Sequence, residues 1–115
     1  MLNIIYRLYD ALGLEIDSDE PVLVIDQDIT VYFNESEDLL EMCCPVGPLP
    51  TQVSQLQHVL QLNYATPIVL AADADNILLL ALARFPETSE GAELEAGLQQ
   101  LIAITRNLRE TFIES

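Results

Sequence analysis

The sequence VLVIDQDITVYFNESEDLLEMCC, which spans residues 22–44, decides the fold of this chain. β-Branched, aliphatic and aromatic residues form three short runs here, and the polar segments 26–28 and 35–38 separate them. The runs predict three strands, over residues 22–26, 29–34 and 39–44. Because both connections are too short to hold a crossover helix, we expect an antiparallel meander.

Apolar residues recur at helical spacing before the meander, in two neighbouring stripes. These stripes are Leu2, Ile5, Tyr9 and Leu12, and Ile4, Leu8 and Ala11. Gly13 follows them and is placed to end the helix in a left-handed cap. The sequence therefore predicts a first helix that is apolar over more than one face.

The proline-rich segment 45–50 follows the meander. Because proline lacks a backbone N–H and has a fixed φ, this segment is predicted to be neither helix nor central strand, and to divide the chain. Thr51 is the expected N-cap of a second helix that runs to about Leu62. Two further strands are predicted over residues 67–72 and 77–84.

A final helix is expected after Pro86, with Thr88 or Ser89 as its N-cap. Its apolar residues recur at spacings of three and four, which predicts a narrow seam against a core or a partner. The seam consists of Leu94, Leu98, Leu101, Thr105, Leu108 and Phe112. The order α-β-β-β-α-β-β-α over residues 1–115 predicts a single α+β domain, with helices packed on a twisted antiparallel sheet.

The charge of the chain is strongly lopsided, with 19 Asp and Glu residues against 4 basic residues and a formal net charge of −15. Such a surface repels phosphate groups and anionic headgroups, so we expect no nucleic-acid partner and no membrane partner. The first residues lack the apolar region of a signal peptide, and no apolar run reaches the length of a membrane span. We therefore expect a cytoplasmic protein with a basic or hydrophobic protein partner.

Charged residues are absent from one continuous part of the chain, residues 42–72. The polar face of the middle helix is formed there by glutamines and His58. Two copies that each carry this net charge should meet where charge is lowest, because one like-charge pair at ~10 Å costs roughly 1–2 kcal/mol at an effective dielectric constant of ~20. The gap predicts a homodimer. The alternative is a helix buried within the monomer, with glutamines at its margin.

The predicted meander has apolar residues on both faces of its strands. Val22 and Val24, for example, alternate with Leu23 and Ile25. The helices can cover one face of the sheet, which leaves the other face and the second stripe of the first helix open. Exposed apolar patches of this kind usually mark partner sites. Alternatively, the dimer or a helix end covers them.

The sequence offers little support for catalysis. It contains none of the motifs G-x-x-x-x-G-K-[ST], G-x-G-x-x-G and G-x-S-x-G. His58 is the only histidine, and the adjacent Cys43 and Cys44 point to opposite faces of a strand, so neither predicts a metal site. The segment 73–76 lacks the glycine and the closing glutamate of a calcium loop and is predicted to be a hairpin turn. We expect no catalytic residues, no metal and no cofactor.

The chain as a whole resembles the class I chaperones of bacterial type III secretion, and among them those that serve inositol-phosphatase effectors. The resemblance extends from about residue 2 to residue 112 and depends on size, acidity and element order as well as on short segments. These segments are RLYDALGL (7–14), VYFNES (31–36), LLEMCCP (39–45), PLP (48–50), LQH (56–58), LNY (62–64) and ADADN (72–76).

The resemblance implies a homodimer that binds the N-terminal region of one secreted effector, such as an inositol phosphatase, and keeps it soluble and secretion-competent without ATP. The type III export machinery would then recognise the complex. The family's architecture, together with the faces of the predicted elements, assigns effector contact to Leu2, Ile4, Leu8, Val22, Val24 and Tyr32. Dimer contact is assigned to Val53, Leu56, Gln57, Leu60 and Ile68.

Two other classes of protein fit parts of the sequence. An acidic inhibitor, or a mimic of nucleic acid, would bind a basic partner, and that complex would dissociate at high salt. A complex held by apolar patches should survive ~0.5 M salt far better, because salt screens charges and leaves apolar contacts in place. A small hydrolase is a third class, and it would need a pocket that these residues do not indicate.

Overall fold

A computed structural model describes residues 4–14, 22–36 and 38–114 of the chain. Its elements are, in order, α1 (Ile4–Leu12), β1 (Val22–Ile25), β2 (Ile29–Glu35), β3 (Leu39–Pro48), α2 (Val53–Ala65), β4 (Val69–Ala72), β5 (Leu78–Pro86) and α3 (Gly91–Glu114). The predicted order α-β-β-β-α-β-β-α and the α+β class are therefore confirmed.

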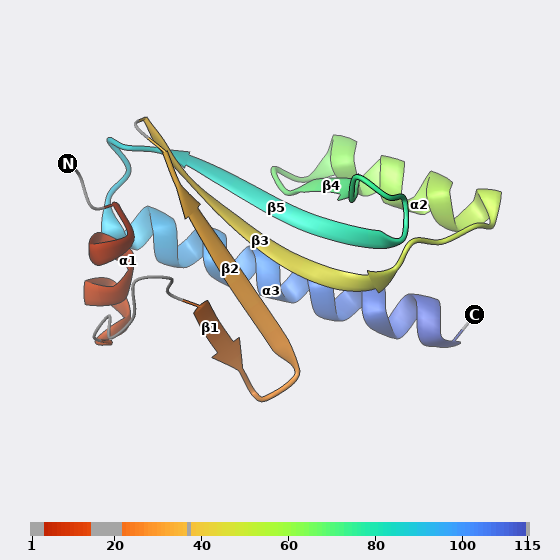
Figure 1. Cartoon of the computed structure of the whole chain (residues 1–115), viewed down its shortest axis with the longest axis horizontal. Coiled ribbons are helices and arrows are strands. Elements are labelled where there is room, and N and C mark those ends of the chain that lie inside the picture. Colours follow the sequence, from red (N-terminus) through yellow and green to blue (C-terminus); the bar gives the residue numbers. More distant parts are fainter. Residues whose placement is uncertain (1–3, 15–21, 37, 115) are drawn as a thin grey trace.

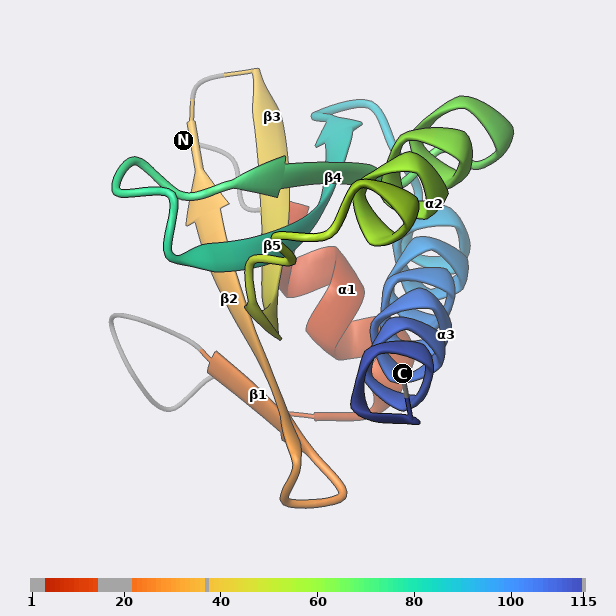
Figure 2. The same cartoon turned by 90° about the vertical axis from the view of Figure 1, so that its right-hand side faces the viewer.

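The five strands form one sheet in the order β1-β2-β3-β5-β4 (Figure 1). Every neighbouring pair is antiparallel, which confirms the predicted meander. Helices α1 and α3 lie on the same face of the sheet, and α2 lies beside β4 (Figure 2). Figure 1 shows α1 and β1 towards one end of the molecule and α2 and β4 towards the other.

The core lies between the sheet and the helices α1 and α3. Alternate residues of β3 point into it, because successive side chains of a strand face opposite sides. The predicted seam of α3 is confirmed: Phe112 is half-buried and packs against the core, and the other seam residues are buried. In the part of the chain that the structure describes, no helix is long and apolar enough to cross a membrane.

The segment 45–50 departs from its prediction. β3 continues through Pro45 to Pro48 and pairs with β5 along this length, with a register shift between Pro45 and Gly47. The partner strand β2 pairs with β3 only as far as Cys43, so the side of β3 that faces away from β5 is an edge beyond this point. Pro45 directs its carbonyl to that edge, where Arg109 binds it, so the missing N–H removes no bond of the ladder.

The helix ends confirm one prediction and correct two. Gly13 has a φ of 73° and ends α1, and the N–H groups of Gly13 and Leu14 donate to the carbonyls of Asp10 and Tyr9, which is the pattern of a Schellman motif. Thr51 is not the N-cap of α2. Gln52 holds that position, makes no capping bond with its side chain, and the helix extends to Ala65.

The start of α3 also differs from the prediction. The helix begins at Gly91, one residue later than a cap at Ser89 would place it. The N–H of Glu90 donates to the carboxylate of Glu93 at 3.2 Å, which is one half of a capping box. The carboxylate of Glu93 thus satisfies the N–H of Glu90, and the prediction of Thr88 or Ser89 as the N-cap is wrong because both residues precede that position.

Candidate functional site

A groove of about 600 Å³ opens between β1, the end of α1 and one side of α3. Its lining is mainly apolar, with Leu12 at the end of α1, Leu14 just after it, Leu23 and Ile25 from β1, and Ile102 from α3. Asp26 and Arg106 are the charged residues of its lining. β1 pairs only with β2 at the edge of the sheet, and the groove lies between β1 and α3.

Two arginines of α3 hold the tip of the β1–β2 hairpin. The three residues 26–28 connect the paired Ile25 and Ile29, the N–H of Asp28 donates to the carbonyl of Ile25 at 3.2 Å, and Asp26 and Gln27 both have positive φ values. Arg106 forms ion pairs with Asp26 at 2.8 Å and with Asp28 at 3.5 Å. Arg109 donates to the backbone carbonyl of Asp28, and the tip of the hairpin is thereby fixed to α3.

Arg109 also closes the gap that opens where β2 separates from β3. Its Nε donates to the carbonyl of Val46 at 2.8 Å, and another nitrogen of the guanidinium donates to the carbonyl of Pro45 at 2.9 Å. Three backbone carbonyls from two chain segments therefore converge on one side chain. The planar guanidinium can satisfy all three because its five donors point in fixed directions.

The acidic side chains around Arg106 set the electrostatics in this part of the groove. The hydrogen bond that Arg106 donates to Asp26, together with the charges of Asp28 and Glu110, raises the pKa of Arg106. Its Nε is buried and has no hydrogen-bond partner among the described residues. Arg106 thus brings to the groove a permanent cation with three carboxylates around it and one donor that has no partner among the described residues.

The face of the sheet opposite the helices is the second surface that the structure leaves open, and we call it the open face. Val22 lies directly across from Tyr32, and Val24 follows on the same face of β1. All three side chains are exposed, and Val24 is 62% exposed. Val69 of β4 and Leu78 of β5 are further exposed apolar residues of this sheet. The open face is continuous with the groove, because Val24 also lines the groove.

A third exposed surface runs along α2. Val53, Gln57, Leu60 and Tyr64 follow at spacings of four, three and four, so they lie on one side of the helix, and we call them the α2 stripe. Leu60 is 64% exposed and Tyr64 is 94% exposed. The residues between 42 and 72, which include all of α2 and β4, carry no charged side chain.

The structure corrects the positions of three side chains to which contact was assigned. Ile4 and Leu8 are only 1% and 0% exposed and belong to the core, so they present no surface to an effector. Both apolar stripes of α1 are used within the monomer because the helix packs against α3 as well as the sheet. Ile68 is 2% exposed and also belongs to the core, so it is not available to a second copy.

The other assigned residues keep a place on a surface or lie outside the described part. Val22, Val24 and Tyr32 lie on the open face, and Val53, Gln57 and Leu60 lie on the α2 stripe. Leu56 is half-buried at the side of the stripe. Leu2 lies outside the described residues.

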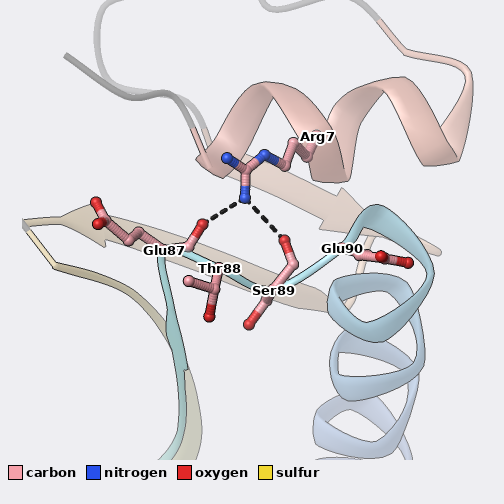
Figure 3. Close-up of a pocket in the computed structure, with 5 residues that line it drawn as sticks. All are labelled: Arg7, Glu87, Thr88, Ser89 and Glu90. Atoms are coloured by element: carbon pink, nitrogen blue, oxygen red, sulfur yellow. Dashed lines mark hydrogen bonds between the residues drawn. The ribbon is translucent and has the colours of Figure 1, made fainter.

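A polar pocket of about 550 Å³ lies where α1 meets the loop between β5 and α3. Figure 3 shows the guanidinium of Arg7 directed at the carbonyls of Glu87 and Ser89, and it donates to both. Thr88 and Glu90 complete the lining. Arg7 therefore ties α1 to the loop that leads into α3.

The remaining reactive side chains also have structural surroundings. Burial raises the pKa of both thiols, with Cys43 half-buried and Cys44 buried in the core, so neither is an activated nucleophile. Asp73 accepts the N–H groups of Ile77 and Leu78 at 2.7 and 3.0 Å, which agrees with the predicted hairpin turn. Within the described ranges, no group of His, Cys, Asp and Glu side chains is arranged to hold a metal ion.

Sequence reasoning missed the two arginines and the α3 side of the groove. Arg106 and Arg109 are two of only four basic residues and are three residues apart, which places them on one side of a helix. That spacing was a usable signal. Their partners, however, lie about 60 to 80 residues away in the sequence, and only the folded chain brings these groups together.

Comparisons with known proteins give a consistent picture. The sequence model of a protein family, the type III secretion chaperone domain, matches residues 3–113. The chain is 50% identical to the chaperone protein SigE of Salmonella typhi over 112 residues, which covers 97% of this chain and 99% of that protein. It is 29% identical to the chaperone protein IpgE of Shigella flexneri over 103 residues, 89% of this chain and 86% of that protein.

Solved structures share the fold. A chain of the ExoT–SpcS complex from Pseudomonas aeruginosa matches with a TM-score of 0.71 and 23% identity, over 92% of this chain and 94% of that chain. At this level of identity the likeness concerns the architecture alone.

Proposed function

The chain belongs to the type III secretion chaperone family, and we propose that it acts in the bacterial cytoplasm as a homodimer that binds the N-terminal region of one secreted effector. The observation that carries this proposal is the number of apolar surfaces that one small domain leaves uncovered. The groove, the open face and the α2 stripe are all exposed in the monomer, although the core between sheet and helices is well filled.

The effector is proposed to bind at the groove and the adjoining part of the open face. An amphipathic helix or an extended segment can lay apolar side chains into such a groove. The outer side of β1 can also pair with a strand, because β1 is an edge of the sheet. Val22, Val24 and Tyr32 are the proposed contacts on the open face, and Ile102 is the proposed contact within the groove.

The dimer is proposed to form through the α2 stripe. Val53, Leu60 and Tyr64 offer apolar area, and the whole of α2 lacks charge, so two copies meet there without opposing their acidic side chains. A symmetric interface places a patch against its own copy, which suits a stripe that is neutral along its length. Leu56 and Gln57 are proposed to lie at the margin of this interface.

The proposal includes what the protein does not do. We infer that it holds its effector by contact alone, without ATP, cofactor or catalysis, and that the type III export machinery recognises the complex. An inositol phosphatase is the proposed class of effector, by the resemblance that the sequence shows to chaperones of such enzymes. The high net charge of −15 supports solubility of the complex.

Dimer formation is tested by Leu60→Asp, with Gln61→Asp as the matched control on the same helix. Gln61 is exposed beside the stripe, so the control adds the same charge one residue away. Light scattering should give the mass of a monomer for Leu60→Asp and the mass of a dimer for the wild type. An intact dimer in the Leu60→Asp variant would remove the α2 stripe from the interface.

Effector binding is tested by Val24→Asp, with Asn34→Asp as the control on the open face. The complex co-purified from the native cell should lose its effector in the Val24→Asp variant and keep it in the control. A salt titration of the wild-type complex adds a second readout. Dissociation by ~0.5 M salt would favour an acidic inhibitor of a basic protein over a chaperone that uses apolar contacts.

A further inference from the structure

The side chain of Asn63 binds the backbone of a single residue in β4. Its Nδ2 donates to the carbonyl of Leu70 at 2.9 Å, and its Oδ1 accepts the N–H of Leu70 at 2.7 Å. Both distances are those of good hydrogen bonds. The amide of Asn63 therefore presents to Leu70 the same donor and acceptor that the backbone of a neighbouring strand would present.

These two bonds lie on the outer side of the sheet. β4 is the last strand in the order β1-β2-β3-β5-β4 and pairs only with β5. The N–H and C=O of one strand residue point to the same side, so Leu70 directs both groups away from β5. The N–H of Ile68, two residues earlier, donates to the hydroxyl of Thr66 at 3.3 Å. Two successive outward N–H groups of this edge are thus engaged by side chains.

The β4 edge has no charge of its own to protect it. Exposed edges recruit further strands, and proteins usually protect them with charges, proline or a covering element. The strand itself is Val-Leu-Ala-Ala, and it lies in the part of the sequence that has no charged residue. Val69, which is exposed, adds apolar area beside this edge. Charge repulsion from within these elements is therefore not available.

We propose that Asn63 seals the β4 edge against strand pairing with a second copy of this chain. A second copy is the relevant partner, because every copy carries the same uncharged β4 edge and the proposed homodimer keeps two copies together. The inference therefore rests on the proposed function for its partner, and on the two Leu70 bonds for its mechanism. With β4 sealed, copies meet through the side chains of α2, and β1 remains the edge at which another strand can pair.

The test uses Asn63→Ala in the full chain, with Gln61→Ala as the matched control that removes an exposed amide from the same helix. Hydrogen exchange of the Leu70 amide reports on the seal directly. We expect exchange at Leu70 to be at least about tenfold faster in Asn63→Ala than in the wild type and the control. Light scattering should also show assemblies larger than the wild-type species, and their mass should rise with concentration.

Two results would overturn the proposal: wild-type exchange at Leu70 in Asn63→Ala, or faster exchange without any change in mass. If Asn63→Ala does not fold, Asn63→Ser replaces it, since its shorter side chain lacks the amide that bonds both groups of Leu70 and adds no charge. That variant should also show faster exchange at Leu70 and form larger assemblies; unchanged mass would overturn the proposal. A wild type that proves monomeric would contradict the α2 dimer, whereas the Leu70 exchange would still decide whether Asn63 protects the edge.

Discussion

The helices α1 and α2 have similar apolar spacing in the sequence and opposite uses in the structure. α1 has nine residues, of which four are buried: Ile4, Ile5, Leu8 and Tyr9. α2 has thirteen residues, of which only Val59 is buried. The comparison shows that helical periodicity identifies an apolar side of a helix but does not say whether that side meets the chain's own core or another molecule.

The surroundings of the two helices account for this difference. α1 packs against α3 and also contacts β2 and β3, so two apolar stripes can both be buried within one monomer. α2 packs chiefly against β4, a short edge strand that can cover only one side of the helix. Its other side is left exposed, and no residue of the helix carries a charge there or elsewhere.

The largest expected difference between the two helices appears when one leucine in each is truncated to alanine. Leu8→Ala should lower the free energy of unfolding by about 3 kcal/mol, because it removes a fully buried side chain and leaves a cavity. Leu60→Ala, at an exposed position, should change the stability of the folded monomer by less than about 0.5 kcal/mol. Chemical denaturation at several protein concentrations measures both.

Protein concentration separates the two roles. The loss in Leu8→Ala should be the same at every concentration, since the side chain acts within one chain. Any loss in Leu60→Ala should grow as the concentration rises, because it reflects weaker association. Equal and concentration-independent losses would contradict the assignment of α1 to the core and α2 to an interface.

The contrast between α1 and α2 also shows which features of the structure could be predicted from the sequence. The element order, the α3 seam and the Gly13 cap could be predicted, because local spacing and backbone preference determine them. The assignment of Ile4 and Leu8 to a surface was wrong, because it depends on what packs against α1. The strand through Pro45 was missed for a similar reason, since a proline is tolerated there only because β2 has already left β3.

The candidate site was less predictable than the fold. Val22 and Val24 could be placed on one face of a strand by alternation alone. The groove could not be predicted, because it is formed by three elements whose contact depends on Arg106 and Arg109 binding a hairpin far away in the sequence. The exposed side of α2 was indicated by the absence of charge, which is a property of composition.

A second prediction tests how tightly α1 is packed. A Cβ at Gly91 would lie 2.9 Å from the backbone carbonyl oxygen of Arg7 and 3.2 Å from the Cβ of Ala11. Gly91→Ala should therefore push α1 away from α3 and lower the free energy of unfolding by about 2 kcal/mol. Ala92→Ser, at the exposed neighbouring position, is the control in thermal and chemical denaturation. An unchanged stability of Gly91→Ala would mean that α1 can shift away from α3 at little cost. The comparison would then fail, because α1 would be packed no more tightly than α2.

A third prediction concerns the β1–β2 hairpin, whose first strand lines the groove. Arg109→Lys keeps the charge but cannot reach three carbonyls with the same geometry, so it should cost about 1 kcal/mol of stability. The loss should be accompanied by faster amide exchange in β1 and the early part of β2, and by little change in α2. Uniform changes in exchange over the whole molecule would show that Arg109 acts on the core instead of on the hairpin.

The smallest expected effect concerns Asp73, the first charged residue after the uncharged segment 42–72. The backbone N–H groups of Leu78 and Ile77 hold the pKa of Asp73 below its usual value of 3.8. A depressed pKa contributes stability that is present above pH ~4 and is lost as the pH falls through the folded-state value. NMR titration of the wild type should show Asp73 titrating below its usual value, with the amide shifts of both partners following the same midpoint. Asp73→Asn keeps the acceptor oxygen and should retain the turn while this acid-dependent change disappears. A midpoint at or above the usual value would mean that the N–H groups of Ile77 and Leu78 do not bind the carboxylate of Asp73.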